Sequence, residues 1–185
     1  KYTPIALLAL SLTGLFLGLV LTSKHFDLNH APPGPPTAIL GFDGMCGEGG
    51  GCAEVNTSKY AKISLGEVRT AMPVSIPAVG FFLMMSILAA ATLRAGSDKR
   101  EKYLAVGAAC FVPALAFSLY LLGVQALVIG KFCVYCLGLD AVTVLAACCA
   151  YLAHGGGFAG IFRDLKSPPR NLIIVLVFAM LIANY

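Results

Sequence analysis

The sequence predicts an all-α membrane protein: a four-helix transmembrane bundle, a truncated fifth transmembrane helix, and a short amphipathic helix in the first outer loop. Of the 185 residues, 58% are hydrophobic and only 12% are charged, whereas about a quarter of the residues in a soluble domain are charged. The mean hydropathy is +0.85. The net charge of +4 fits the usual cytoplasmic Lys/Arg excess of membrane proteins, so it indicates no nucleic-acid partner.

Four apolar stretches are long enough to span a membrane, since about 20 helical residues cross the hydrocarbon core. Pro77 and Gly80 are expected to bend the second stretch, and Pro113 to interrupt the third. Residues 96–102 are expected to form a short turn, and Gly130 with Lys131 a tight connection. The expected spans are residues 4–22, 73–94, 103–129 and 132–152.

A partial fifth span begins at Asn171 and is only 15 residues long at Tyr185. The chain also begins with Lys rather than Met. We therefore interpret the sequence as a fragment trimmed at both ends. It divides into a transmembrane core, residues 1–153, and a cytoplasmic linker with the partial fifth span, residues 154–185.

The outer loop, residues 23–72, is too long to be a simple connector and is expected to carry function. A Pro-rich segment opens it, and a Gly-rich stretch follows that encloses Cys46 and Cys52. From residue 56 or 57 to about 70, apolar and charged side chains mix in a way that suits an amphipathic helix on the membrane surface.

Charge in the loops predicts the orientation of the chain. Lys and Arg gather around residues 94–102 and again in residues 154–170, and these two loops share one side of a five-span layout. That side is therefore cytoplasmic. The long loop holds four basic and five acidic residues, a formal charge of −1, so it lies outside together with residues 133–136. Disulfides persist in such an oxidising compartment.

Cys133 and Cys136 form a Cys-x-x-Cys motif where the fourth span begins. Residues three apart share a helix face, and a helix N-terminus favours a thiolate. Half of a zinc site is the alternative, but the sequence has no second pair at zinc-finger spacing and no His nearby. We therefore expect a redox dithiol and no metal.

The other cysteines fall into two groups. Cys46 and Cys52 enclose five residues, mostly Gly, so they suit either a mobile thiol shuttle or a structural disulfide that pins the loop. Cys110, Cys148 and Cys149 lie inside spans, where small buried packing residues are the better explanation.

Together these features resemble the vitamin K epoxide reductase family, and the bacterial homologues most closely. The resemblance covers nearly the whole chain. Its strongest part is the combination of the two cysteine pairs and a Ser six positions after the second loop Cys. The matching residues are Cys46-x5-Cys52, Ser58 within residues 53–60, Gly80, Tyr120 thirteen positions before the motif, and Cys133-Val134-Tyr135-Cys136.

The resemblance implies a membrane thiol:quinone oxidoreductase that supports disulfide-bond formation. Electrons would enter from a thioredoxin-like periplasmic protein or fused domain. They would pass through Cys46 and Cys52 to Cys133 and Cys136, and then to a quinone of the ubiquinone, menaquinone or vitamin K type. The implied location is the bacterial inner membrane, with the active site on the periplasmic side.

Four residues are the candidate quinone contacts: Ser58, Tyr60, Tyr120 and Asp140. Ser58 and Tyr60 have structural readings as a helix N-cap and an interfacial anchor. Asp140 stands in a stretch where the animal enzymes have Thr-Tyr-Ala. It could hand a proton to the reduced quinone, or reach the surface and bond Lys131, and the second reading is slightly favoured.

Two rival functions stay open. A DsbB-type quinone-coupled disulfide oxidase has similar chemistry, but its Cys-x-x-Cys lies in the first outer loop rather than at the start of a fourth span. A membrane scaffold or transporter with a structural loop disulfide would not be an enzyme. It predicts a permanently oxidised Cys46–Cys52 bond and no response to added quinone.

Overall fold

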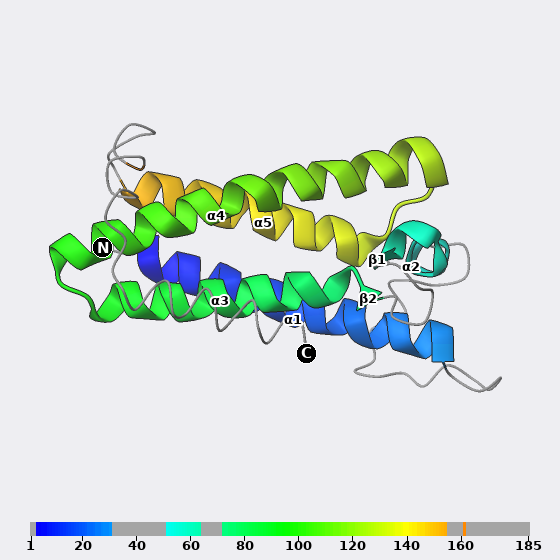
Figure 1. The fold of residues 1–185 in the computed structure, drawn as a ribbon, viewed down its shortest axis with the longest axis horizontal. Helices are drawn as coiled ribbons and strands as arrows, with labels where there is room; N and C mark the ends of the chain where they lie inside the picture. The colour runs from blue at the N-terminus through cyan, green and yellow to red at the C-terminus, as the bar shows by residue number, and fades with distance from the viewer. Residues whose placement is uncertain (1–2, 31–50, 64–71, 155–160, 162–185) are drawn as a thin grey trace.

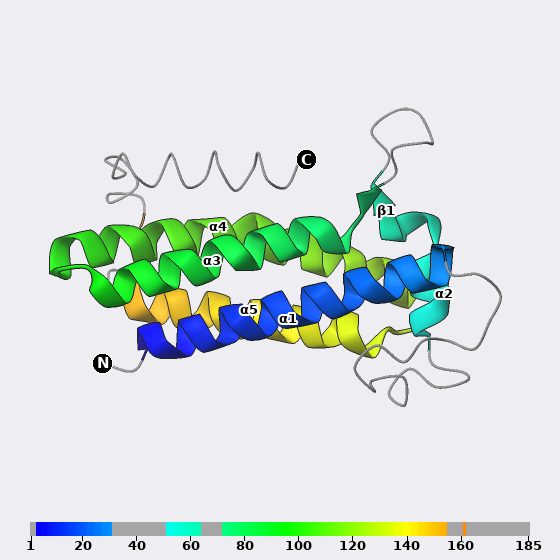
Figure 2. The ribbon, with the colours of Figure 1, turned by 90° about the horizontal axis from the view of Figure 1, so that it is seen from below.

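The computed structural model describes residues 3–30, 51–63, 72–154 and 161. Four long helices run side by side along most of its length (Figure 1). Each helix contacts two others, in the cyclic order α1, α3, α4, α5, and Figure 2 shows α3 with α4 above α1 with α5. The helices are α1 Thr3–His30, α3 Ser75–Arg94, α4 Ser97–Gly123 and α5 Val134–His154. The predicted all-α bundle is confirmed.

Within the described residues, four helices are long and apolar enough to cross a membrane. The shortest of them, α3, has 20 residues, which at 1.5 Å per residue gives about 30 Å, the thickness of the hydrocarbon core. Many of the outward-facing side chains are large and apolar, such as Leu119 and Leu152. Lipid is the solvent that suits such a surface.

Two of the four helices differ from the predicted bounds in ways that matter. Helix α1 continues to His30 rather than ending near residue 22, so it reaches into the region assigned to the outer loop. Helix α4 begins at Ser97, which makes most of the predicted turn helical, and it passes Pro113 without interruption. The extended backbone of Gly96, with ψ 164°, separates α3 from α4 instead.

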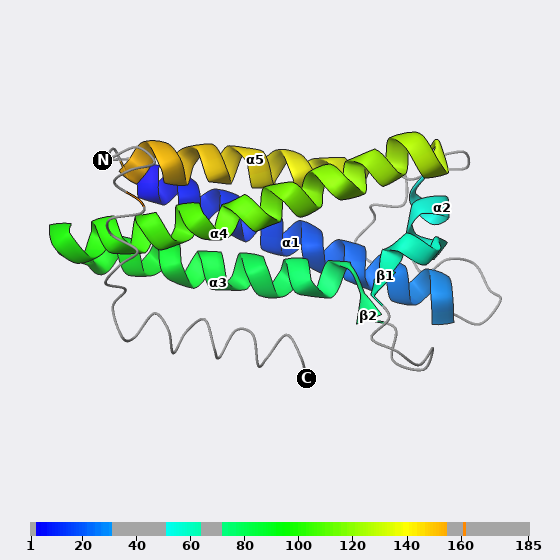
Figure 3. The ribbon, with the colours of Figure 1, turned by 45° about the horizontal axis from the view of Figure 1, so that its top comes forward.

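A π-helix, Val124–Ile129, follows α4 directly and extends it by six residues. Gly130 then takes a left-handed conformation with φ 67°, which suits Gly because it has no Cβ. The predicted tight connection is confirmed, and it brings the start of α5 to the same end of the bundle as the end of α4 (Figure 3).

The described part of the outer loop lies at this end of the bundle (Figure 1). It contains a one-turn-and-a-half helix α2, a 3-10 helix η2 and two short antiparallel strands that pair with one another. The elements are α2 Cys52–Thr57, η2 Lys59–Ala61, β1 Lys62–Ile63 and β2 Met72–Pro73.

The prediction of one amphipathic helix from residue 56 or 57 to about 70 is therefore wrong where the structure describes it. Helix α2 begins earlier, at Cys52, and stops at Thr57 because Ser58 adopts an extended backbone with ψ 156°. Strand pairing then holds Lys62 extended, and Val74 adds a hydrogen bond from its N–H to the carbonyl of Ala61, at 3.0 Å.

The core has two buried clusters. The larger joins all four long helices and includes Met85, Ala105 and Phe111. The smaller lies at the end that carries the outer loop, and it consists of Val20, Leu21, Cys52, Val55, Cys133 and Tyr135. The bundle therefore packs one cysteine of the loop and one of the Cys-x-x-Cys motif into the same apolar cluster.

Several predictions lie outside the described residues. They concern Cys46, the Pro-rich part of the outer loop, the loop after His154 apart from Ile161, and the partial fifth span.

Candidate active site

The Cys-x-x-Cys motif straddles the start of α5. Cys133 precedes the first helical residue and its carbonyl accepts the N–H of Leu137 at 2.9 Å, so it stands at the N-cap position. The backbone N–H of Cys136 donates to the sulfur of Cys133 at 3.3 Å. Both residues are free thiols, and Cys133 is completely buried. The start of α5 thus brings the side chains of the two cysteines to the same side, as their spacing predicts.

The pKa of the Cys133 thiol is lowered. Its largest cause is a hydrogen bond with the side chain of Cys136, and the backbone N–H groups of Cys136 and Tyr135 lower it further. Burial and the negative charge of Asp140 act in the opposite direction. Cys133 precedes the membrane span. Because its pKa is lowered, it is the cysteine of the pair that more readily forms a thiolate, the form that exchanges with disulfides.

Cys52, the first residue of α2, is disulfide-bonded and buried. Gly51 holds α2 against the segment before Cys133, since a Cβ at residue 51 would lie 2.7 Å from the Cβ of Lys131 and 2.8 Å from the carbonyl oxygen of Phe132. The local sequence thus needs Gly at this position for close approach. Cys46, the partner of Cys52 in the predicted loop disulfide, lies outside the described residues.

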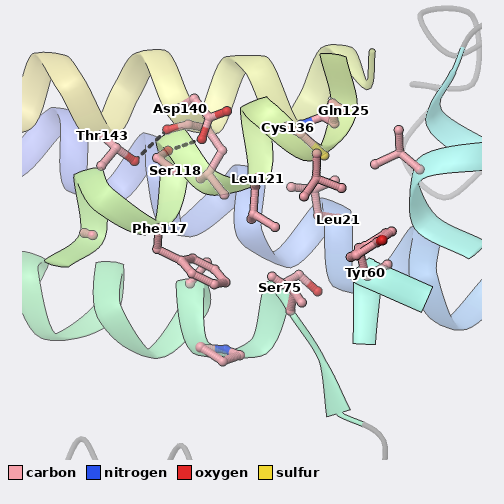
Figure 4. A pocket seen from close by; sticks show the side chains of 18 of the residues that line it. Leu21, Tyr60, Ser75, Phe117, Ser118, Leu121, Gln125, Cys136, Asp140 and Thr143 are labelled. Atoms are coloured by element: carbon pink, nitrogen blue, oxygen red, sulfur yellow. Dashed lines mark hydrogen bonds between the residues drawn. The ribbon is translucent and has the colours of Figure 1, made fainter. Parts of the chain in front are cut away.

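A cavity of about 330 Å³ opens beneath these cysteines, between the four long helices and the described part of the outer loop. Figure 4 shows Cys136 and Gln125 near one another, with Asp140 and Ser118 toward one side and Tyr60 toward the other. Most of the lining is apolar or aromatic, and it includes Leu21, Phe81, Phe82, Phe117, Leu121 and Leu139. Such a cavity suits a flat apolar ligand that carries few polar atoms.

Asp140 lines the cavity and accepts a hydrogen bond at Oδ1 from the hydroxyl of Ser118. Its other oxygen, Oδ2, is buried and has no hydrogen-bond partner in the described part of the chain. The favoured reading, in which Asp140 reaches the surface and bonds Lys131, is therefore wrong. The carboxyl points into the bundle, where an acidic group is costly unless it has a function.

The structure brings Ser58 and Tyr60 to the cavity but not Tyr120. Ser58 is both the C-cap residue of α2 and the N-cap residue of η2. Its hydroxyl donates to the carbonyl of Val55 at 2.8 Å and makes no side-chain N-cap hydrogen bond. The Tyr60 ring carries the Lys59 ammonium over its face, 5.1 Å from the centroid. Tyr120 is 55% exposed and stacks on Phe117, which does line the cavity.

Two buried amides of the site were not singled out from the sequence. Gln125 is 3% exposed and its Oε1 accepts the backbone N–H of Cys133 at 2.9 Å. Asn56 is 8% exposed and donates from Nδ2 to the carbonyl of Cys52 at 3.0 Å. Both also line the cavity. Gln125 had a signal, since it is the one polar side chain in the apolar run of residues 121–129.

The remaining cysteines are free thiols with different surroundings. Cys110 lines the cavity, Cys149 is half-buried, and Cys148 is exposed on the outer face of α5. The expectation that Cys148 is a buried packing residue is wrong, because its helix turns this position away from the bundle. Among the described residues, no group of three or more His, Cys, Asp or Glu could hold a metal ion.

Comparison with known proteins agrees with this arrangement. The model of the vitamin K epoxide reductase family matches residues 5–151, which include nearly all of the four long helices, the outer loop and both cysteine pairs. A comparison with curated proteins finds no match. The family match covers most of the chain, and the chain therefore belongs to the vitamin K epoxide reductase family, whose members are membrane oxidoreductases that link thiols to quinones.

Proposed function

We propose that this protein re-oxidises a thioredoxin-like partner and passes the electrons through Cys46 and Cys52 to Cys133 and Cys136, and then to a quinone. The observation that carries the proposal is the position of the Cys-x-x-Cys pair. Cys133 is buried beside disulfide-bonded Cys52 in one cluster, while Cys136 lines the cavity. The pair thus lies between a disulfide and a site for an apolar ligand.

The cavity residues fit a quinone head group. A quinone ring is flat and apolar, and its two carbonyl oxygens need hydrogen-bond donors once they leave water. The lining supplies aromatic side chains such as Phe81 and Phe117, and few polar groups. A volume of about 330 Å³ is near the lower end for small-molecule sites, about 300 to 1,000 Å³. A bound quinone would accept two electrons and two protons.

The thiol steps balance without any further oxidant. A dithiol of the partner reduces the loop disulfide by exchange, and the partner leaves as a disulfide. A loop thiolate then attacks an oxidised Cys133–Cys136 pair at Cys133, which forms a mixed disulfide and releases Cys136 as a thiolate. The second loop thiolate attacks the loop sulfur of that mixed disulfide, so the loop disulfide closes again and Cys133 is released as a thiolate. The structure has Cys52 oxidised with Cys133 and Cys136 reduced, which corresponds to the state after this transfer.

Ser58, Tyr60 and Asp140 are the proposed quinone contacts among the predicted residues, because all three line the cavity. Tyr120 is left out of the proposal, since its exposed ring lies outside that lining. Asp140 is one helical turn after Cys136. When it is protonated, its buried Oδ2 would be able to give a proton to a reduced oxygen and take one back from a thiol.

The partner and the compartment belong to the same proposal. The redox site lies at the end of the bundle that carries the outer loop (Figure 1), and loop charge puts this end outside. We place the protein in a bacterial inner membrane with the site facing the periplasm, where a thioredoxin-like protein or a fused domain would deliver electrons. Residues 1–153 would form the catalytic core, and residues 154–185 a linker and partial fifth span.

The test is thiol-linked quinone reduction in membranes that contain the protein. Cys133→Ala and Cys136→Ala should each abolish it. Cys46→Ala should stop turnover with a protein dithiol but keep activity with dithiothreitol, because the small reductant can bypass the loop. Cys148→Ala, at an exposed position on the same helix as the motif, is the matched control. Unaltered rates in the first two variants would contradict the proposal and leave the structural-disulfide alternative.

A further inference from the structure

Gln125 connects the catalytic motif to the cavity. It lies in the π-helix Val124–Ile129 and is almost fully buried, with 3% of its surface exposed. Its Oε1 accepts the backbone N–H of Cys133 at 2.9 Å. π-Helical turns are rare and often occur at functional sites. Here the π-helix positions the Gln125 amide to accept the backbone N–H of Cys133, the first cysteine of the motif.

The hydrogen bond to Cys133 also fixes which way the amide faces. Only the oxygen of the amide can accept a hydrogen bond from an N–H group, so the NH₂ group of Gln125 must point away from Cys133. No hydrogen bond of Nε2 occurs within the described part of the chain, although the side chain is buried and lines the cavity. An amide nitrogen beside an apolar cavity is stabilised by an acceptor, so a ligand that presents a carbonyl oxygen there would suit it.

Two other polar groups of the lining differ from Gln125 in this respect. Ser58 gives its hydroxyl hydrogen to Val55 at 2.8 Å. Asp140 accepts at Oδ1 from Ser118 and needs a proton before it can donate. Within the described residues neither hydrogen of Gln125 Nε2 has an acceptor. A neutral amide donates without titration, and Gln125 lies near Cys136 (Figure 4).

We propose that Gln125 is a two-ended orienting residue, which holds the Cys133 backbone through Oε1 and donates from Nε2 to a carbonyl oxygen of the quinone. This inference rests on the proposed function and assigns the quinone a fixed orientation beside Cys136. Reduction places negative charge on the carbonyl oxygen, and a preorganised donor stabilises that charge. Gln125 transfers no proton. The two protons that quinol requires equal the two that the dithiol releases on forming its disulfide.

The experiment measures quinone binding and the infrared carbonyl stretch, using the oxidised protein so that no electron transfer occurs. The probe is a short-chain ubiquinone with an isotope label at each carbonyl in turn. In the native sequence, one labelled carbonyl should show a lowered stretching frequency relative to the same quinone in empty detergent micelles. Gln125→Met should abolish this shift and raise the Kd about five- to tenfold, as expected for one lost hydrogen bond.

Two further variants make the test specific. Leu127→Ala, in the same π-helix but 87% exposed, should bind quinone with the native shift. Gln125→Glu keeps an oxygen opposite the Cys133 N–H, so it serves if the Met variant does not fold. In alkaline buffer its ionised carboxylate has no hydrogen to donate, and the shift should again be lost.

An unchanged carbonyl shift and Kd in both Gln125 variants would overturn the inference while leaving the proposed function intact. A native protein that binds no quinone would instead refute the proposed function, and this inference with it.

Discussion

Gly51 is the residue at which the loop helix α2 meets the segment that leads to Cys133, and Gly51→Ala should interrupt the passage of electrons between them. A Cβ here would lie 2.7 Å from the Cβ of Lys131 and 2.9 Å from the backbone nitrogen of Phe132. Ordinary contact begins at 3.4 Å, so the segments must separate by 3.4 − 2.7 = 0.7 Å at Lys131 and by 3.4 − 2.9 = 0.5 Å at Phe132. These atoms belong to the backbone or to a Cβ, and no rotamer change moves them away.

Disulfide exchange is sensitive to a shift of this size, because the attacking sulfur must approach along the axis of the disulfide bond. Misplacement of reacting groups by about 1 Å costs on the order of 100-fold in rate, so we expect a loss of about ten- to 100-fold. The assay is quinone reduction driven by a reduced thioredoxin-like protein and, separately, by dithiothreitol. Only the first rate should fall, because dithiothreitol can reduce the motif without the loop.

Gly123→Ala is the matched control, since a Cβ at residue 123 has nothing within 4 Å. It should leave both rates within about twofold of the native ones, as expected for a substitution without a steric cost. If Gly51→Ala transfers electrons from the protein dithiol at the native rate, then the contact between α2 and the segment before Cys133 does not govern the exchange. The reasoning from this close approach would be refuted.

Two further predictions concern the groups around the motif. The lowered pKa of Cys133 means that its thiolate forms at lower pH than an ordinary thiol, and Cys136→Ala removes the largest cause. In fully reduced protein, the thiolate ultraviolet absorbance of Cys136→Ala, taken as a difference from the double variant Cys133→Ala/Cys136→Ala, should therefore titrate at higher pH than that of the native protein taken as a difference from Cys133→Ala. An unmoved titration would exclude the hydrogen bond as the cause. Asp140→Asn keeps an acceptor for Ser118 but cannot release a proton, so single-turnover quinol formation should slow by about 100-fold with little change in quinone affinity. Native turnover in that variant would remove Asp140 from the proton path.

The sequence predicts the bundle well because hydropathy reports directly on lipid exposure. It misses the start of α4 for the same reason. Residues 97–102 are mostly polar, yet a helix can project beyond the hydrocarbon core when its first turns lie in water and Lys102 reaches Asp98 one turn away, at 3.7 Å. Pro113 also misleads, because neighbouring helices can satisfy the backbone group that a proline leaves unpaired.

The site is less accessible to sequence reasoning than the fold, because its contacts are distant in the chain. Ser118 and Asp140 are 22 positions apart and meet only when α4 packs on α5. Gln125 reaches Cys133 only because a π-helix and the left-handed Gly130 set the direction of the chain. A hydropathy profile contains none of this information. The four cysteines could be proposed as site residues from the sequence because their spacing is itself a chemical signal.

Burial of Cys133 separates the relay into an outer and an inner half, and this yields a final prediction. Cys133 is fully buried in the cluster that contains Cys52, and Cys136 lines the cavity whereas Cys133 does not. Electrons from the loop should therefore pass through Cys133 before they reach the thiol at the cavity. In reverse, a Cys133 thiolate can attack the loop disulfide, forming a mixed disulfide and releasing one loop thiolate.

Cys136 normally resolves this mixed disulfide, so Cys136→Ala should accumulate a covalent link between Cys133 and a loop cysteine, which mass spectrometry of peptides prepared without reductant can detect. Cys133→Ala should accumulate no link to Cys136, because that thiol faces the cavity rather than the loop. Equal amounts of the two links would mean that either cysteine reaches the loop. The division of labour within the motif, with Cys133 exchanging and Cys136 facing the quinone, would then be wrong even if the overall reaction were right.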